Sequence, residues 1–188
     1  MNKQVGLAFL LLVLIAWLSL VSLNATTSVK MKDFHSLQLT TLEGQTIDFS
    51  SFKGKKVLVV NTASACGLTP QLEALEQLHQ KYGDKLVVIG VPTNDFGGQE
   101  PLEGEAIKSF CERNYGVSFL MLDKGNARGS DKHELLRWLT ERRYNGKRSS
   151  RIWWNFQKYL IDEQGELVDY FLPITDPMSS RITRHLEN

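Results

Sequence analysis

The sequence contains little cysteine, little histidine and no excess of charge of either sign. Its 22 Lys and Arg residues nearly balance its 21 Asp and Glu residues, which gives a formal net charge of +1. This balance excludes an electrostatic nucleic-acid binder, and a hydrophobic content of 42% excludes a disordered chain. No phosphate-binding loop is present. The four histidines are dispersed without metal-ligand spacing, so we expect no metal site. They are His35, His79, His133 and His185.

The first two dozen residues differ from the rest of the chain. Lys3 precedes an apolar run over residues 5–23, and a polar segment follows at residues 24–28. A basic start, an apolar stretch and small residues afterwards are typical of a secretory signal. The run is also close to the roughly 20 residues that span a bilayer. We therefore expect residues 1–29 to be a signal peptide or an N-terminal membrane anchor. Residues 30–188 would then be exported to the periplasm, secreted, or held at a membrane by the uncleaved segment.

Hydrophobic patterning in the remainder predicts alternating strands and helices. Residues 56–62 and 86–91 are apolar runs rich in β-branched side chains, as expected for strands buried on both faces. A helix is expected after each strand, at residues 70–82 and 103–113. The other expected elements are an N-terminal β-hairpin (37–40 and 45–49), a short strand (118–122), a helix (132–142), a second hairpin (159–161 and 167–170) and a last helix after Pro177.

This order of elements predicts a single α/β domain with a thioredoxin-like fold. Its mixed central sheet, parallel early in the chain and antiparallel late, would be flanked by helices and preceded by the N-terminal β-hairpin. No internal repeat, low-complexity tract or linker interrupts residues 35–188.

The two cysteines lie in different sequence contexts. A structural disulfide is the simplest use for two cysteines in an exported domain. Cys66, however, lies between a buried strand and the start of a helix, where unpaired backbone N–H groups and the helix dipole favour a thiolate. Gly67 and its small neighbours leave the approach to the sulfur open. We interpret Cys66 as a reactive nucleophile, and the lack of a Cys-x-x-Cys motif argues against an ordinary disulfide oxidoreductase.

Four segments in order along the chain resemble the glutathione peroxidase family, in particular its cysteine-containing, thioredoxin-dependent members. The resemblance covers nearly all of residues 35–188. Each segment alone is modest evidence, whereas the set is highly specific. The segments are residues 61–71 (NTASACGLTPQ), 94–101 (NDFGGQEP), 110–119 (FCERNYGVSF) and 154–160 (WNFQKYL).

The resemblance implies a catalytic tetrad. Cys66 matches the peroxidatic position, and Gln99, Trp154 and Asn155 match the polar residues that complete the tetrad. Attack of a thiolate on a peroxide places negative charge on the departing oxygen, which amide or indole N–H groups stabilise. Taken singly, Gln99 is typical of a surface loop, Trp154 of a core and Asn155 of a turn. Their joint occurrence within the four segments favours the functional interpretation.

Cys111 matches the resolving cysteine of the thioredoxin-dependent members. A cysteine near the end of a helix is, by itself, usually a small buried hydrophobe. A sulfenic acid on Cys66 would condense with a nearby thiol to a disulfide. The two cysteines are 45 positions apart in the sequence, so we hypothesise that the helix with Cys111 unwinds locally to reach Cys66.

One departure from the family pattern is Asp95 in place of Gln, which would raise the pKa of Cys66 if it pointed inward.

The resemblance also implies partners. The substrates would be hydrogen peroxide and organic or lipid hydroperoxides, with a thioredoxin-like protein as reductant and glutathione as the weaker alternative. No bound cofactor is needed. The tetrameric members carry an extra loop where residues 142–148 of this chain lead quickly into Trp153, so a monomer or weak dimer with an open site is expected.

Two other interpretations stay open on the residues alone. The first is a peroxide-sensing redox relay protein that acts on a partner through a Cys66–Cys111 disulfide, with incidental turnover. The second is an inert exported domain in which that disulfide is structural and resists mild reductants.

Overall fold

The computed structural model describes residues 31–187 of the chain. The apolar run at residues 5–23, with its expected role as signal or anchor, lies outside the described residues. Within residues 31–187, no helix combines the length and the apolar character needed to cross a membrane.

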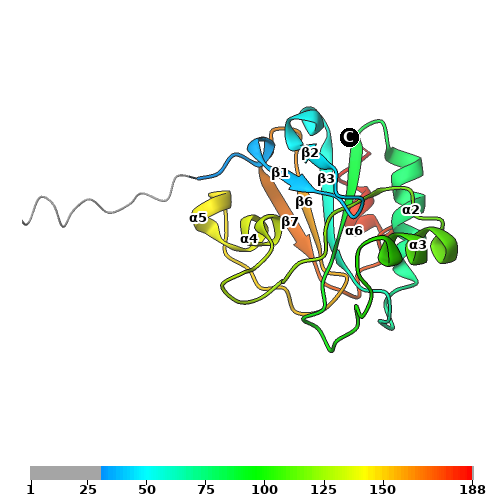
Figure 1. Ribbon diagram of the computed structural model, residues 1–188. Coiled ribbons are helices and arrows are strands. Elements are labelled where there is room, and N and C mark those ends of the chain that lie inside the picture. Colours follow the sequence, from blue (N-terminus) through cyan, green and yellow to red (C-terminus); the bar gives the residue numbers. More distant parts are fainter. Residues whose placement is uncertain (1–30, 188) are drawn as a thin grey trace, which may run out of the picture. The chain divides into compact units, whose positions relative to one another are not determined.

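A five-stranded mixed sheet forms the centre of the structure (Figure 1). Its strand order is β5-β4-β3-β6-β7, with β3, β4 and β5 parallel and with β6 and β7 antiparallel to their neighbours. The parallel-then-antiparallel sheet expected from the sequence is therefore confirmed. The strands are β3 (Lys56–Thr62), β4 (Leu86–Pro92), β5 (Leu120–Met121), β6 (Lys158–Ile161) and β7 (Leu167–Phe171).

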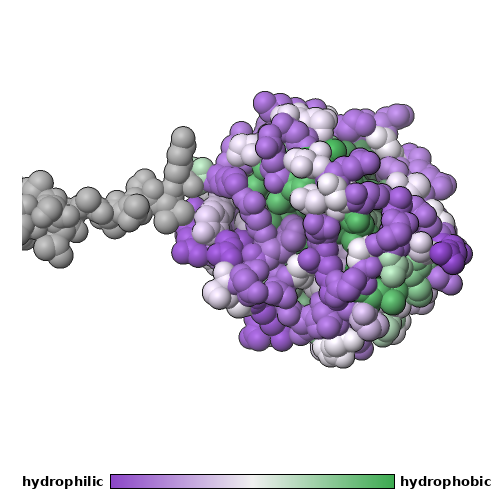
Figure 2. Space-filling view, viewed as in Figure 1, coloured by the Kyte–Doolittle hydropathy of each residue, from purple (hydrophilic) through white to green (hydrophobic). Residues whose placement is uncertain are grey.

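Helices cover both faces of this sheet (Figure 1). One face is covered by α2 (Gln71–Tyr82), α3 (Gly104–Tyr115) and the short α6 (Ser180–Thr183). The other is covered by α4 (Glu134–Thr140), with α5 (Arg142–Asn145) beside it, and by the 3-10 helices η1 (Phe34–Ser36) and η2 (Phe49–Phe52). The N-terminal hairpin pairs β1 (Gln38–Thr40) with β2 (Thr46–Asp48). Polar residues cover most of the surface shown in Figure 2, with apolar residues in small patches.

The apolar core has two parts because side chains alternate across β3. Leu58 and Val60 belong to the core under α2 and α3, the α2-side core, while Val57 and Val59 belong to the core under α4, the α4-side core. All four side chains are fully buried. Full burial of such a side chain stabilises the fold by about 1.5–3 kcal/mol. The helices on both faces of the sheet therefore pack against the same strand, β3.

Two expected elements differ from the structure. The helix expected at residues 132–142 ends at Thr140, because Glu141 is extended (φ −121°, ψ 114°) and the Thr140 hydroxyl donates to the carbonyl of Leu136. The strand expected at 118–122 is reduced to two residues. The backbone N–H and the hydroxyl of Ser118 both bond to the carboxylate of Glu76, so pairing with β4 begins only at Leu120.

Lys158, the first residue of β6, is a fully buried lysine. Its ammonium donates to the side-chain oxygen of Gln71 and to the carbonyls of Pro173 (2.9 Å) and Thr175 (2.7 Å). These bonds join the start of α2 to the segment after β7. Burial lowers the pKa of Lys158 to about 7, against a smaller opposing effect of Asp176.

The depressed pKa of Lys158 predicts a pH dependence of stability. Between about pH 7 and the ordinary lysine pKa of roughly 10.4, the unfolded chain binds more protons than the folded one, so the free energy of unfolding rises with pH. From pH 6.5 to 8.5 this contribution amounts to about 2 kcal/mol. Urea unfolding followed by circular dichroism should show this rise for the wild type relative to Lys158→Met. A pH-independent difference between the two proteins would contradict it.

Candidate active site

Cys66 lies in the loop that joins β3 to α2. Thr69 closes this loop: its hydroxyl donates to the carbonyl of Ala63 (2.8 Å) and accepts from the N–H of Cys66 (3.0 Å). The N–H of Thr69 returns to the carbonyl of Cys66 (3.0 Å). Cys66 is buried, with 8% of its surface exposed, whereas Gly67 is exposed and has open space where a side chain would begin. The loop therefore holds the sulfur just below an open surface.

The donor at the sulfur is a loop N–H group. The backbone N–H of Leu68 points to Cys66 Sγ at 3.4 Å. The helix α2 begins only at Gln71, so the donor expected from the helix terminus comes instead from the turn before it. A backbone N–H in this direction favours negative charge on the atom that accepts it.

Gln99 and Asn155 form an amide pair. The NH₂ group of Asn155 donates to Gln99 Oε1 at 3.1 Å and to the carbonyl of Phe96 at 3.4 Å. With its oxygen engaged in this way, Gln99 offers its own NH₂ group to a ligand. The carbonyl of Gln99 accepts the N–H of Ala65 at 2.9 Å, which ties the amide pair to the residue before Cys66. The structure thus joins Gln99 to Asn155 through their side chains and to the Cys66 loop through the backbone, while the catalytic roles of these residues stay a prediction.

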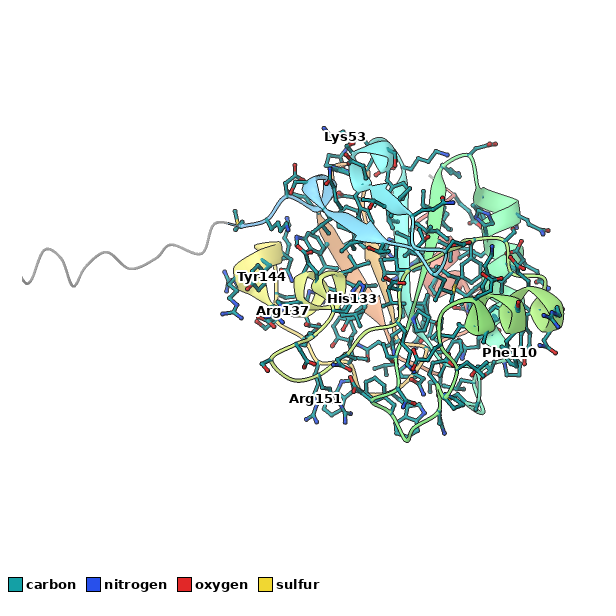
Figure 3. All side chains as sticks on the ribbon, viewed as in Figure 1. Lys53, Phe110, His133, Arg137, Tyr144 and Arg151 are labelled. Atoms are coloured by element: carbon teal, nitrogen blue, oxygen red, sulfur yellow. The ribbon has the colours of Figure 1, made fainter. Side chains whose placement is uncertain are left out.

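Trp154 lies at the rim of this arrangement. Its ring packs against Phe96, with centroids 6.0 Å apart, and 40% of its surface stays exposed. Gly97, beside the Trp154 ring and the Gln99 side chain, has a positive φ of 72°. This backbone conformation, rather than a lack of space, is what favours glycine there. Trp153 is also exposed, at 57%, so neither tryptophan is a core residue. Figure 3 places Arg151, which leads into this pair, at the lower edge of the molecule.

Asn61 holds the segment of Trp154 and Asn155 in place, a role that the sequence analysis missed. Its side chain donates to the carbonyl of Trp154 (3.2 Å) and accepts the N–H of Gln157 (3.1 Å), and its carbonyl accepts the N–H of Phe156 (2.7 Å). Phe156 has a φ of 67°, which is costly for a bulky residue and persists where the surroundings impose it. The available signal was an asparagine in the apolar strand β3.

Asp95 does not point toward Cys66. Its carboxylate accepts the backbone N–H groups of Ala127 and, at 3.0 Å, Arg128. The side chain thus fastens the loop of Gln99 to a neighbouring loop.

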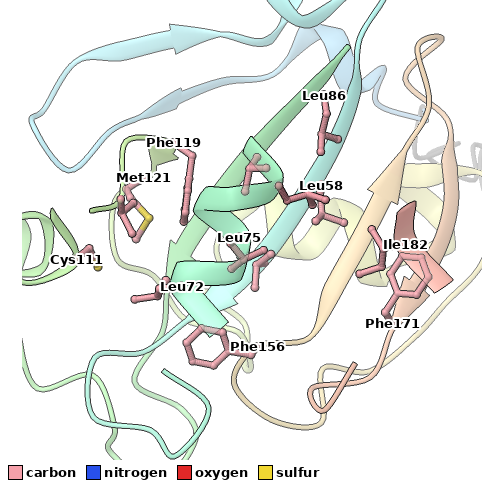
Figure 4. Close-up of a cluster of buried hydrophobic side chains, with 14 of the residues drawn as sticks. Leu58, Leu72, Leu75, Leu86, Cys111, Phe119, Met121, Phe156, Phe171 and Ile182 are labelled. Carbon is pink, nitrogen blue, oxygen red and sulfur yellow. The ribbon is translucent and has the colours of Figure 1, made fainter. Parts of the chain in front are cut away.

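Cys111 lies on α3, and no disulfide joins it to Cys66: both are free and buried in the α2-side core. Figure 4 shows Cys111 at the edge of this core, beside Phe119 and Met121. A cavity of about 180 Å³, lined by these three residues, Glu43, Lys108 and Glu112 among others, adjoins it. Burial, with smaller contributions from the charges of Glu100 and Glu112, raises the pKa of the Cys111 thiol to about 12.

Glu100 is a second residue to which the sequence analysis assigned no role. Only 1% of its surface is exposed, and its carboxylate accepts the hydroxyl of Ser64 at 2.7 Å. Burial raises the pKa of Glu100, against the bond from Ser64 and the charge of Lys124. The signal in the sequence was its position next to Gln99.

The described residues do not gather metal ligands. Within residues 31–187, no group of three or more His, Cys, Asp or Glu side chains is placed to hold a metal ion. His133 instead caps α4 by accepting the N–H of Leu135 (3.2 Å), and burial lowers its pKa to about 4.

Comparison with known proteins assigns the chain to a family. The family model described as glutathione peroxidase matches residues 34–140. A glutathione peroxidase-like peroxiredoxin of Chlamydomonas reinhardtii is 43% identical over 148 residues, which cover 78% of this chain and 91% of the relative. A glutathione peroxidase of Lactococcus lactis is 42% identical over 146 residues, or 77% and 92% of the two chains.

A solved structure agrees in fold. The crystal structure of Trgpx in apo form is 31% identical, with a TM-score of 0.63, and the match covers 84% of this chain and 97% of that one. The thioredoxin-like fold, with its mixed sheet and N-terminal hairpin, is therefore confirmed. The chain belongs to the glutathione peroxidase family and is a glutathione peroxidase-like peroxidase.

Proposed function

We propose that this peroxidase works through a two-cysteine cycle. The Cys66 thiolate attacks a hydroperoxide, the O–O bond breaks, and the departing alkoxide takes a proton to leave as an alcohol. Cys66 is then a sulfenic acid, which condenses with the thiol of Cys111 to form a disulfide and release water. A reductant restores both thiols with two electrons and two protons.

The amide pair of Gln99 and Asn155 is the observation that carries the first step. It is bonded through Ala65 to the loop of Cys66, whose sulfur accepts the N–H of Leu68. Fixed N–H donors beside the sulfur stabilise the negative charge that develops on the departing oxygen, and they need no rearrangement during the reaction. In this proposal the donors are the Leu68 N–H, the NH₂ group of Gln99 and, at the rim, the indole of Trp154, while Asn155 holds the Gln99 side chain in place.

The weak attachment of α3 supports Cys111 as the resolving cysteine. Of the twelve residues of α3, only Ile107 and Cys111 are buried. A helix with so few buried contacts opens locally at a small cost in free energy. We propose that α3 unwinds after Cys66 is oxidised and so lets the two sulfurs meet.

A thioredoxin-like dithiol protein is the reductant that suits such a disulfide. Its first thiolate attacks one sulfur, and its second thiol resolves the mixed disulfide. The name of the Chlamydomonas relative, a glutathione peroxidase-like peroxiredoxin, accords with this choice. The name of the Lactococcus relative keeps glutathione as the alternative.

Exposed apolar side chains support organic and lipid hydroperoxides as substrates alongside hydrogen peroxide. Trp153 and Trp154 are exposed, and so is Ile174, at 80%. The carbonyl of Pro173, next to Ile174, accepts a hydrogen bond from Gln71, which follows the Cys66 loop, so Ile174 is tied to the region of Cys66.

We also propose that the enzyme acts outside the cytoplasm, either free or anchored by residues 5–23, and that it is a monomer or weak dimer.

Treatment of the reduced protein with one equivalent of hydroperoxide tests the cycle. Intact mass under non-reducing conditions should show a loss of two mass units per chain, because two S–H bonds become one S–S bond. Cys111→Ser should instead stop at a sulfenic acid on Cys66, and Cys66→Ser should not react. A persistent sulfenic acid in the wild type would remove Cys111 from the cycle and favour glutathione.

Loss of the Gln99 amide should slow the attack on the peroxide. We expect Gln99→Ala to lower the second-order rate constant for oxidation of Cys66 by about 10²-fold, because one donor to the departing oxygen is lost. Rapid mixing with hydrogen peroxide and intact mass measures this rate. Gln164→Ala, in an exposed turn, is the matched control and should keep the wild-type rate. Equal rates in both variants would exclude Gln99 from the reaction.

Oxidation should loosen α3 but not α2. Hydrogen exchange measured on reduced and disulfide-linked protein should show faster exchange in residues 104–115 after oxidation, because helical hydrogen bonds are broken. Residues 71–82 serve as the internal reference. Identical protection of α3 in the two states would rule out its unwinding.

A further inference from the structure

Glu100 is a buried carboxyl group to which the proposed cycle assigns no task. It is held on several sides: its N–H donates to the side chain of Asn94 (2.9 Å), its carbonyl accepts from the ammonium of Lys124 (2.9 Å), and its carboxylate accepts from Ser64 (2.7 Å). A carboxyl removed from water in this way is costly to the fold unless it is hydrogen-bonded. Its position is therefore well defined.

This carboxyl is hydrogen-bonded to the segment of Cys66 and lies near enough to Cys111 for its charge to act on that thiol. Ser64, which donates to it, is two residues before Cys66. On the other side, the Glu100 charge acts on the thiol of Cys111 and contributes to the raised pKa of that thiol. Leu102, between Glu100 and the start of α3, packs on the core that contains both cysteines.

The condensation step needs a base at Cys111. At pH 7 a thiol with a pKa of about 12 is almost entirely protonated, whereas the attacking species is the thiolate. Unwinding of α3 would bring the pKa only toward the ordinary value of roughly 8.5, at which the thiol form still dominates. A base that takes the proton from Cys111 as its sulfur attacks would therefore speed this step.

The other charged groups around Cys111 suit this task less well. Lys108 forms ion pairs with Glu43 (2.9 Å) and Glu112 (3.7 Å). The side chains of Glu43 and Glu112 are 36% and 50% exposed, so water solvates both carboxylates. Among these three glutamates, only Glu100 is buried. The hydrogen bond from Lys124 goes to the main-chain carbonyl of Glu100 and not to its carboxylate. Burial also raises the pKa of Glu100, toward the operating pH at which a general base is most effective.

We propose that Glu100 is the general base of the resolving step and that Ser64 relays the proton to the leaving oxygen. Glu100 accepts the proton of Cys111 while the Cys111 sulfur attacks the sulfenic acid of Cys66. The S–S bond forms, the S–O bond breaks, and the hydroxide that leaves takes a proton from the Ser64 hydroxyl, which Glu100 replaces. Water is released, and both residues return to their initial states. This role rests on the two-cysteine cycle proposed above.

The rate at which sulfenic acid converts to disulfide tests this role. The full-length protein, reduced and then mixed with one equivalent of hydrogen peroxide, is quenched at set times between pH 5.5 and 8.5 and analysed by intact mass. We expect Glu100→Gln to slow this conversion by about 10²-fold, the lower bound of typical general-base effects. It should also remove the fall in rate at acid pH, because the amide accepts the Ser64 hydrogen bond but takes no proton. Cys66 should form its sulfenic acid at the wild-type rate.

Matched variants separate a base from a structural residue. Glu112→Gln removes the other glutamate charge that acts on Cys111 and should keep the wild-type rate and pH profile. Glu100→Asp keeps a carboxylate and should restore the acid limb at a reduced rate. A Glu100→Gln variant that forms the disulfide at the wild-type rate, or more slowly with an unchanged pH profile, would overturn the proposal. Failure of the wild type to form any disulfide would overturn the cycle itself, which is a distinguishable result.

Discussion

The side chain of Asn61 provides the hydrogen bonds on which the site depends. It lies near the end of β3, just before the chain turns toward Cys66, and it binds the backbone on both sides of Asn155. Two segments that are more than 90 residues apart in sequence are thereby held at one edge of the sheet. Because Asn61 is 1% exposed, these bonds are protected from competition with water, and their loss would leave buried polar groups without partners.

Several other polar side chains in this region are also buried and also depend on hydrogen bonds to neighbouring loops. Asn155, Glu100 and Lys158 are each at most 1% exposed, and each would destabilise the fold without partners. Most of their polar atoms are satisfied by neighbouring loops. Asn155 Oδ1 is an exception, with no hydrogen-bond partner among the described residues, as happens at functional sites. The apolar layers around the sheet fix the loops, and the buried polar groups fix the side chains to which the proposed chemistry assigns roles.

The two cysteines lie in parts of the fold that differ in how tightly they are packed and hydrogen-bonded. The loop of Cys66 is closed by Thr69 and bonded to the Gln99 segment, so its sulfur has a fixed set of neighbours. The helix of Cys111 buries only two side chains and adjoins a cavity. This difference supports the proposed cycle, in which the thiol of Cys111 moves toward that of Cys66.

The sequence by itself determined the order of the strands and helices and the family, and it predicts which residues form the tetrad. Runs such as residues 56–62 have strong local preferences, and motif residues lie at fixed spacings. Only the tertiary structure decided the end of α4 at Thr140, the outward direction of Asp95 and the anchoring role of Asn61. Each of these depends on hydrogen bonds between groups distant in sequence or on a local bond that competes with the helix, and no pattern of hydrophobicity records such bonds. The pairing of Glu100 with Ser64 belongs to the same class.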